Sequence, residues 1–313
     1  MSDNVIVAKL PEVCVLMSTY NGEKYLKEQI NSILAQKGVC VKLFVRDDGS
    51  SDNTLDILQE YADKGLLEIV TFGGNFGPAK SFMELLYYVG DKYDYYAFAD
   101  QDDIWKEEKL SVAVSMIGKA DRPKLYCSNW YLYQNNNDYG LFFPDNLEFS
   151  LIHVLCFNSF AGCTMLFNRS LVTYLINPEY RPSETLLKVR MHDTWIISAA
   201  SLLGEILYDK NSYILHRIHG NNTAGLPDFN KWNIKRYIEI FVLHTSKLGY
   251  GASTLARDLM KLLPFADKEQ TKIIKLFADA KHNKVALIRS KQIRKEWHGN
   301  RLRFVVKVLM GWL

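Results

Sequence analysis

The stretch Tyr95-Tyr96-Ala97-Phe98-Ala99-Asp100-Gln101-Asp102-Asp103-Ile104-Trp105 joins an apolar run to three carboxylates. An apolar run of this length predicts a buried strand. In an open α/β sheet, ligands bind outside the carboxyl ends of the strands, which is where these acids would lie. Three like charges repel one another unless a cation joins them, and a divalent cation with oxygen ligands is the simplest candidate. The competing interpretation is an acidic loop solvated at the surface, but the apolar residues on both sides favour a site.

Composition narrows the class of protein. The chain has 313 residues, of which 48% are hydrophobic and 23% charged, as in an ordinary globular protein with one large domain or two modest ones. A net charge of +3 is too small to indicate nucleic-acid binding. The five cysteines form no C-x-x-C pair, which argues against a disulfide framework or a zinc site. Because we find neither a signal peptide nor an apolar span of about 18 residues, we expect a cytoplasmic protein.

Strands and helices alternate through the first third of the chain. Apolar runs at 13–17, 41–45 and 67–72 predict three strands before the one that ends at Asp100. Between them lie segments with apolar residues at helical spacing, such as 23–36. This alternation predicts βαβ units, and right-handed crossovers bring the ends of all four strands to one rim. We therefore expect an α/β fold with a Rossmann-like, mostly parallel sheet flanked by helices.

The segments at this rim suggest a nucleotide ligand. Asp47-Asp48 follows one strand and the acidic stretch follows another, so one carboxylate can accept from a base or a ribose while others hold Mg²⁺ or Mn²⁺ against a diphosphate. Tyr20 either stacks on the base or packs under the sheet edge. The glycines at 73–77 lack both the G-x-G-x-x-G and the P-loop spacing, which argues against hydride transfer and P-loop chemistry. They either permit a tight turn or contact the ligand directly.

A series of motifs resembles a known family. In order, they are Ser18-Thr19-Tyr20-Asn21-Gly22, Asp47-Asp48-Gly49-Ser50-Ser51-Asp52, Asn75-Phe76-Gly77, Asp100-Gln101-Asp102-Asp103-Ile104-Trp105, Gly162-Cys163-Thr164-Met165, His192-Asp193 and His216-Arg217-Ile218-His219-Gly220-Asn221-Asn222. On these residues the chain resembles the family 2 glycosyltransferases, inverting enzymes with the GT-A fold. Within that family it is similar to the rhamnosyltransferase-like branch of polysaccharide assembly enzymes. The resemblance covers residues 12 to 225.

The resemblance implies a role for each matched residue. Asp193 falls on the catalytic base, and Asp102 falls on the metal position of the D-x-D motif. His219 is assigned to the metal as well, although a structural role explains it equally well. Where many members have Glu-Asp, this chain has His192-Asp193, which leaves the role of His192 open. The nucleotide-binding positions are Ser18, Tyr20, Asn21, Asp48, Asn75 and Asp100.

The implied reaction is transfer of one sugar with inversion. One base deprotonates the acceptor hydroxyl, and a bound Mg²⁺ or Mn²⁺ stabilises the departing diphosphate. The Q-x-x-R-W motif of processive members is absent from the sequence, so we expect a single addition. The resemblance favours dTDP-rhamnose as donor, followed by UDP-galactose or UDP-glucose, with a saccharide or lipid-linked saccharide as acceptor. The competing interpretations are a nucleotidyltransferase and a non-catalytic nucleotide-sugar-binding or scaffold protein.

The end of the chain differs from the rest. Nine lysines and arginines follow residue 280 against one acid, Glu296, and the last ten residues are mostly apolar. We expect a catalytic domain at 1–225 and a helical region at 226–313 whose end lies on the cytoplasmic face of a membrane as a peripheral protein. The alternatives are a helix docked on the catalytic domain and a contact within a homo-oligomer.

Overall fold

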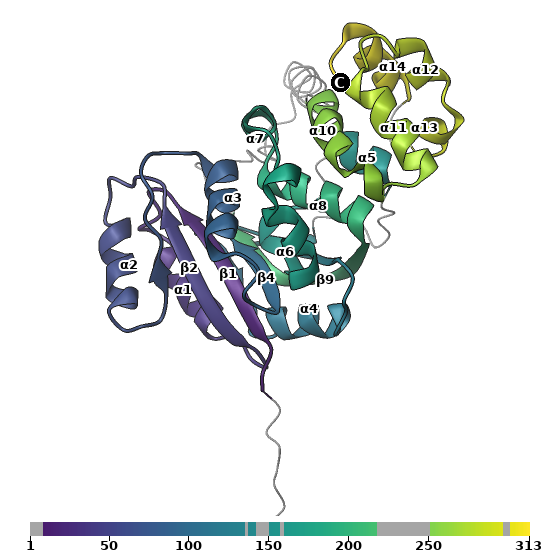
Figure 1. The fold of residues 1–313 in the computed structure, drawn as a ribbon. Helices are drawn as coiled ribbons and strands as arrows, with labels where there is room; N and C mark the ends of the chain where they lie inside the picture. Colours follow the sequence, from purple (N-terminus) through teal and green to yellow (C-terminus); the bar gives the residue numbers. More distant parts are fainter. Residues whose placement is uncertain (1–8, 135–136, 142–149, 157–159, 218–250, 297–300) are drawn as a thin grey trace, which may run out of the picture.

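The computed structural model describes residues 9–134, 137–141, 150–156, 160–217, 251–296 and 301–313. Within them, nine strands form one sheet in the order β3-β2-β1-β4-β8-β6-β9-β5, and β7 pairs with β6 (Figure 1). The strands are β1 (Glu12–Thr19), β2 (Cys40–Asp47), β3 (Glu68–Ile69), β4 (Tyr95–Ala99), β5 (Ile104–Trp105), β6 (Lys124–Gln134), β7 (Asn137–Leu141), β8 (Met165–Asn168) and β9 (Glu205–Arg217).

The first four strands are parallel, as the alternating pattern predicts. β1 lies between β2 and β4, and Val13 to Met17 are fully buried because layers cover both faces of the sheet. β3 is shorter than the predicted strand at 67–72. The Val70 N–H still donates to the Val45 carbonyl at 2.8 Å, but the chain then leaves the sheet through exposed residues 73–75.

The second half of the sheet is mixed. β8 runs antiparallel between β4 and β6, whereas β9 runs parallel to β6 and antiparallel to β5. β6 is one long strand whose register against β9 shifts around Asn129. The small residues before β8 form a 3-10 turn, η1 (Gly162–Thr164).

Helices cover both faces of the sheet. α3 (Pro78–Val89), α6 (Arg169–Ile176) and α8 (His192–Leu203) lie in front of it in Figure 1, whereas α1 (Leu26–Leu34) lies behind. Pro78 occupies the first turn of α3, where its missing N–H costs nothing, and Gly90 ends the helix with φ 69°. The remaining helices of this part are α2 (Thr54–Ala62), α4 (Lys109–Ile117), α5 (Leu151–Cys156), η2 (Pro178–Tyr180) and α7 (Glu184–Val189).

The C-terminal helices pack onto this layer. They are α10 (Ala252–Leu259), η3 (Met260–Phe265), α11 (Lys268–Ala278), α12 (Lys284–Arg289), α13 (Lys291–Glu296) and α14 (Arg301–Met310). α10 contacts α5, α7 and α8, so Leu255 and Leu259 join the same buried core as the sheet. The predicted boundary at 225/226 lies outside the described residues and stays a prediction. Among the helices described, none has the length and apolar character needed to cross a bilayer.

Candidate active site

Four loops meet at one rim of the sheet, as the sequence predicts. The register pairs Ser18 with Arg46 and Met17 with Ala99, so the carboxyl ends of β2, β1 and β4 lie side by side. The loop after β3 joins them through hydrogen bonds to Arg46 and Asp48. Polar side chains from four separate segments therefore lie within reach of one ligand.

The loops after β1 and β2 hold each other in place. Asp47 accepts hydrogen bonds from the Thr19 hydroxyl at 2.9 Å and from the Ser50 N–H at 2.8 Å. Asn21 has a left-handed backbone with φ 48°; its N–H donates to Ser50 Oγ and its Oδ1 accepts from the Ser51 N–H, both at 2.8 Å. We predicted that Asn21 binds the nucleotide. In the structure, its side-chain oxygen accepts a hydrogen bond from the backbone of the loop after β2.

Asp48 forms a buried ion pair with Arg46. Its Oδ1 also accepts from the Phe76 N–H at 2.7 Å and from the Ser81 hydroxyl at 3.0 Å, and its Oδ2 accepts from the Gly77 N–H at 2.8 Å. Burial alone would raise the pKa of Asp48, but Arg46 and the other donors lower it below its ordinary value. One lone pair of Oδ2 is all that remains for a nucleotide N–H, so Asp48 is chiefly occupied in fixing the 73–77 loop.

Arg46 completes this cluster from inside the sheet. Its guanidinium is fully buried, donates to the Gly74 carbonyl at 2.7 Å and lies over the Phe76 ring, 4.3 Å from the centroid. A buried charge needs such partners because an unpaired one is strongly unfavourable. Asn75, a predicted nucleotide contact, is exposed within the loop that this arginine and Asp48 hold.

Gln101 links the acidic stretch to the loop after β1. The Tyr20 N–H donates to Gln101 Oε1 at 2.9 Å, and Gln101 Nε2 donates to the Tyr20 carbonyl at 3.0 Å. A Cβ atom on Gly22 would lie 2.3 Å from the same Oε1, so a side chain at this position would displace Gln101 from its hydrogen bonds with Tyr20. The Tyr20 residue is 51% exposed, which agrees with a ring available for stacking and not with packing under the sheet edge.

The acids after β4 stand in a different environment. Asp103 is fully buried; its Oδ1 lies 2.9 Å from His216 Nδ1, and its Oδ2 has no hydrogen-bond partner among the described residues. Burial and the neighbouring carboxylates of Asp103 and Asp102 raise the pKa of Asp100 to about 7. Burial would lower the pKa of His216, but the Asp103 carboxylate beside it raises that pKa to about 9. His216 therefore carries the positive charge that offsets Asp103.

Arg217 ties the end of β9 to this stretch. Its Nε donates to the Asp102 carbonyl at 3.0 Å, its Nη2 donates to Glu28 at 2.6 Å, and the guanidinium lies over the Tyr25 ring, 4.5 Å from the centroid. The acidic stretch is thus held on one side by Gln101 and on the other by Arg217. Arg217 therefore lies between three segments of the rim.

Side chains that could ligate a metal gather at the acidic stretch. Among the described residues, Asp100, Asp103, Cys163 and His216 place one potential ligand atom each within 4.8 Å of one another. The carboxylates, including the unpartnered Oδ2 of Asp103, suit Mg²⁺ or Mn²⁺. The Cys163 thiol does not, because burial and both acids raise its pKa and keep it protonated. The residues present therefore fit a hard cation held by oxygen atoms.

The predicted metal ligands differ from this group. Asp102 is partly exposed at the rim, and its side chain does not belong to the group. His219 lies outside the described residues. Both assignments remain predictions, and Asp100, which was predicted to bind the nucleotide, belongs to the group.

Asp193 begins the first turn of α8 and is 6% exposed. Its Oδ1 accepts from the Thr194 hydroxyl at 3.3 Å, and the positive end of the helix dipole favours its ionised form. His192 before it stacks on Phe82 with ring centroids 4.1 Å apart and packs edge-on against Phe98 at 4.7 Å. Because Phe98 precedes Asp100 by two residues, these contacts place the start of α8 at the end of β4.

His192 is a neutral core residue. Burial lowers its pKa to about 3, and neither ring nitrogen has a hydrogen-bond partner in the described ranges. A Cβ atom on Gly162 would lie 2.5 Å from Nε2, so the ring fills the space that this glycine leaves. The role left open for His192 is therefore packing between α3, β4 and η1.

Sequence reasoning missed Arg46, Gln101 and Cys163 and did not pair His216 with Asp103. Arg46 carried a signal, since a charged residue ends an otherwise apolar strand next to two acids. Gln101 and Cys163 belong to motifs named in the sequence analysis, but neither residue was assigned a role there. The pairing of residues 103 and 216 depends on β9 lying beside β5, which no local pattern reveals.

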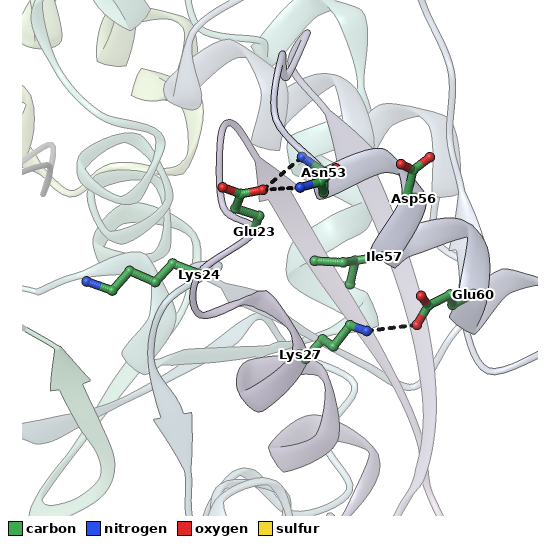
Figure 2. Close-up of a pocket in the computed structure, with 7 residues that line it drawn as sticks. All are labelled: Glu23, Lys24, Lys27, Asn53, Asp56, Ile57 and Glu60. Atoms are coloured by element: carbon green, nitrogen blue, oxygen red, sulfur yellow. Dashed lines mark hydrogen bonds and ion pairs between the residues drawn. The ribbon is translucent and has the colours of Figure 1, made fainter.

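A surface hollow of about 630 Å³ lies elsewhere, between α1 and α2 (Figure 2). It is lined by Glu23, Lys24, Lys27, Asn53, Asp56, Ile57 and Glu60. Glu23 accepts from the Asn53 amide at 2.7 Å and Lys27 pairs with Glu60 at 2.9 Å, as Figure 2 shows. None of the predicted site residues lines this hollow.

Comparison with known proteins gives a family match. The model of "Glycosyl transferase family 2" matches residues 14–168. A dTDP-rhamnosyl transferase, RfbG, of Shigella flexneri is 31% identical over 230 residues, covering 70% of this chain and 77% of the relative. An Escherichia coli protein, the UDP-Glc:alpha-D-GlcNAc-diphosphoundecaprenol beta-1,3-glucosyltransferase WfgD, is 32% identical over 51% of this chain and 61% of its own length.

Solved structures share the fold. The structure of residues 1–349 of S. aureus TarS in complex with UDP aligns with 95% of this chain and 81% of that chain. The TM-score is 0.57 and the sequence identity 19%. This likeness confirms the expected architecture, a mostly parallel sheet flanked by helices.

Proposed function

The chain belongs to glycosyl transferase family 2, and from this premise we propose that it moves a single sugar, with inversion, from a nucleotide-diphosphate sugar to a saccharide acceptor. The product belongs to the assembly of a bacterial cell-surface polysaccharide. The observation that carries the proposal is the rim itself, where four loops converge beside Asp193 at the start of α8.

Asp193 acts as the general base. It deprotonates the acceptor hydroxyl while that oxygen attacks the anomeric carbon from the face opposite the nucleotide. The buried position of Asp193 and its place in the first turn of α8 support this role, since the carboxylate is held in one orientation. No covalent enzyme intermediate is required.

Asp102 would hold Mg²⁺ or Mn²⁺, with His219 as a further ligand and Asp100 paired with Asp102 on the side of the ribose. When bound, this cation supplies the positive charge that stabilises the departing diphosphate. Ser18, Tyr20, Asn21, Asp48 and Asn75 bind the nucleoside, in part through the loops that they order. The exposure of Tyr20 supports stacking of its ring on the base. The remaining lone pair of Asp48 Oδ2 can accept one hydrogen bond from the base.

The donor and acceptor are proposed from the relatives. The name of the Shigella flexneri relative supports dTDP-rhamnose, and the name of the Escherichia coli relative supports UDP-glucose and a lipid-linked acceptor. A lipid-linked acceptor would keep the enzyme at the cytoplasmic face of the membrane, with residues 1–225 as catalytic domain and 226–313 as the helical region that approaches the lipid.

The test is a panel of dTDP-rhamnose, UDP-galactose and UDP-glucose, each with and without Mn²⁺. One donor should raise the melting temperature and be consumed only with the cation. Asp193→Asn should abolish transfer while leaving nucleotide binding intact. Transfer at the wild-type rate by this variant would contradict the assignment of the base, and no response to any donor would favour a scaffold protein.

A further inference from the structure

The last helix, α14, has two apolar faces. Phe304 and Val308 are buried against the other C-terminal helices at 4% and 2% exposure. The opposite face carries Leu302, Val306, Leu309 and Met310, which are 71%, 38%, 55% and 58% exposed. At about 100° per residue these four side chains form one stripe. The helix is thus anchored by one side and presents hydrocarbon on the other.

α12 extends this stripe. It packs against α14, and the Lys284 amine donates to the Leu309 carbonyl at 2.7 Å, where a cation also stabilises the C-terminal end of the helix. The next residue, Val285, is 61% exposed. We call Val285, Leu302, Val306, Leu309 and Met310 the α12–α14 face. All of these except Val306 are the most exposed large apolar side chains among the described residues, and they lie at the end of the molecule remote from α2 (Figure 1).

The charge around this face has one sign. Residues 281–313 carry nine lysines and arginines against one acid, whereas the whole chain has a net charge of only +3. Lys291, Arg294, Lys295 and Arg301 are exposed. The remaining 280 residues are therefore net acidic, and the basic character is concentrated in the helices that bear the apolar stripe.

We propose that the α12–α14 face docks onto an anionic lipid bilayer. Exposed apolar side chains on a basic helix insert at the boundary between headgroups and acyl chains, and the surrounding cations are attracted to anionic lipid. α14 has ten residues and cannot span the bilayer, so it lies along the surface. A second copy of the chain is a poorer occupant because it would bring two basic surfaces together. The inference rests on the proposed location at a membrane and identifies the surface responsible.

The test uses the full-length protein and two matched double variants. Leu309→Ser with Met310→Ser removes two side chains of the face. Leu55→Ser with Met116→Ser removes the same residue types at 46% and 40% exposure from α2 and α4. Vesicles of phosphatidylcholine alone, and with one quarter phosphatidylglycerol, are floated with each protein. The wild type and the α2–α4 variant should float with the anionic vesicles, and the α14 variant should bind at least about tenfold more weakly.

Three outcomes would overturn the proposal. They are equal binding by all three proteins, equal loss in both variants, and light scattering that shows a dimer which the α14 substitutions alone dissociate. The last result would assign the face to a second copy. Transfer to a soluble acceptor should be unchanged by the α14 substitutions, so a failure of docking and a failure of the proposed reaction are distinguishable.

Discussion

The acids that follow β2 and those that follow β4 lie on either side of β1, yet their surroundings differ. Asp47 and Asp48 accept hydrogen bonds from backbone and side chains of their own and neighbouring loops, and Arg46 neutralises Asp48. After β4, Asp100 has a raised pKa, and one oxygen of Asp103 has no hydrogen-bond partner within the part of the chain that the structure describes. The first pair therefore holds the protein together, and the second group retains capacity for a ligand.

This difference separates two properties that a cluster of acids can have. A carboxylate whose lone pairs are filled stabilises the fold, and removing it leaves buried donors unsatisfied. Carboxylates that face one another without enough donors repel, and a cation relieves that repulsion. Substitutions in the two segments should therefore affect different measurements.

The largest effect is expected from Asp102→Asn. If Asp102 holds the cation, kcat/KM for transfer should fall about a thousandfold, near 4 kcal/mol in activation free energy. The melting temperature should hardly change because Asp102 is partly exposed. Asp56→Asn, an exposed acid in the hollow between α1 and α2, is the matched control and should leave both quantities unchanged.

Asp48→Asn should act on the fold instead. It breaks a buried ion pair and leaves Arg46 uncompensated, which costs about 3 kcal/mol of unfolding free energy. Urea denaturation measures this loss. Glu60→Gln breaks the half-exposed pair with Lys27 and should cost less than about 1 kcal/mol. If both variants lost a similar amount of unfolding free energy, the stabilising role assigned to Asp48 would be contradicted.

A smaller effect should appear in the pH dependence of stability. The pKa of His216 is raised from 6.5 to about 9, so its pairing with Asp103 stabilises the folded state fully below pH 6.5, and that contribution is lost as pH rises to 9. Between pH 7.5 and 9.5 the unfolding free energy of the wild type should fall by about 2 kcal/mol relative to that of His216→Gln, because other buried groups such as Lys109 titrate alike in both proteins. His216→Gln should flatten this decline; an unchanged slope would contradict the ion pair.

The smallest effect is expected from Gln101→Ala, which cuts the link between the acidic stretch and Tyr20. Loss of two hydrogen bonds should weaken nucleoside diphosphate binding about fivefold, near 1 kcal/mol. Unfolding free energy should change less than it does in Asp48→Asn. Gln59→Ala, on the exposed surface of α2, serves as the control in the same calorimetric titration.

Much of the rim could be predicted from the sequence. Apolar runs located β1, β2 and β4, and the handedness of the crossovers brought their ends together. The bounds of β3 could not be predicted from its apolar run. The chain leaves the sheet here because the Gly74 carbonyl accepts a hydrogen bond from the buried Arg46, and this long-range contact has no local sequence signal.

The division of labour between the acids was also beyond the sequence. Asp48 and Asp100 are the same residue type, and only their partners distinguish them. Asp48 is held by residues up to 33 positions away, whereas Asp100 lies beside Cys163 and His216. These partners meet only through the order of the strands. The motif order nevertheless singled out Asp193, which is buried in the first turn of α8.

Calorimetric titration of dTDP and UDP, with and without Mn²⁺, tests the distinction between the two acidic segments most directly. It is made on the wild type, Asp102→Asn and Asp48→Asn below the melting temperature of each. Mn²⁺ should tighten binding by the same factor in the wild type and in Asp48→Asn, and have no effect in Asp102→Asn. A metal effect that survives in Asp102→Asn would contradict the assignment of Asp102 to the metal, and one that is lost in Asp48→Asn would contradict the distinction between the two segments.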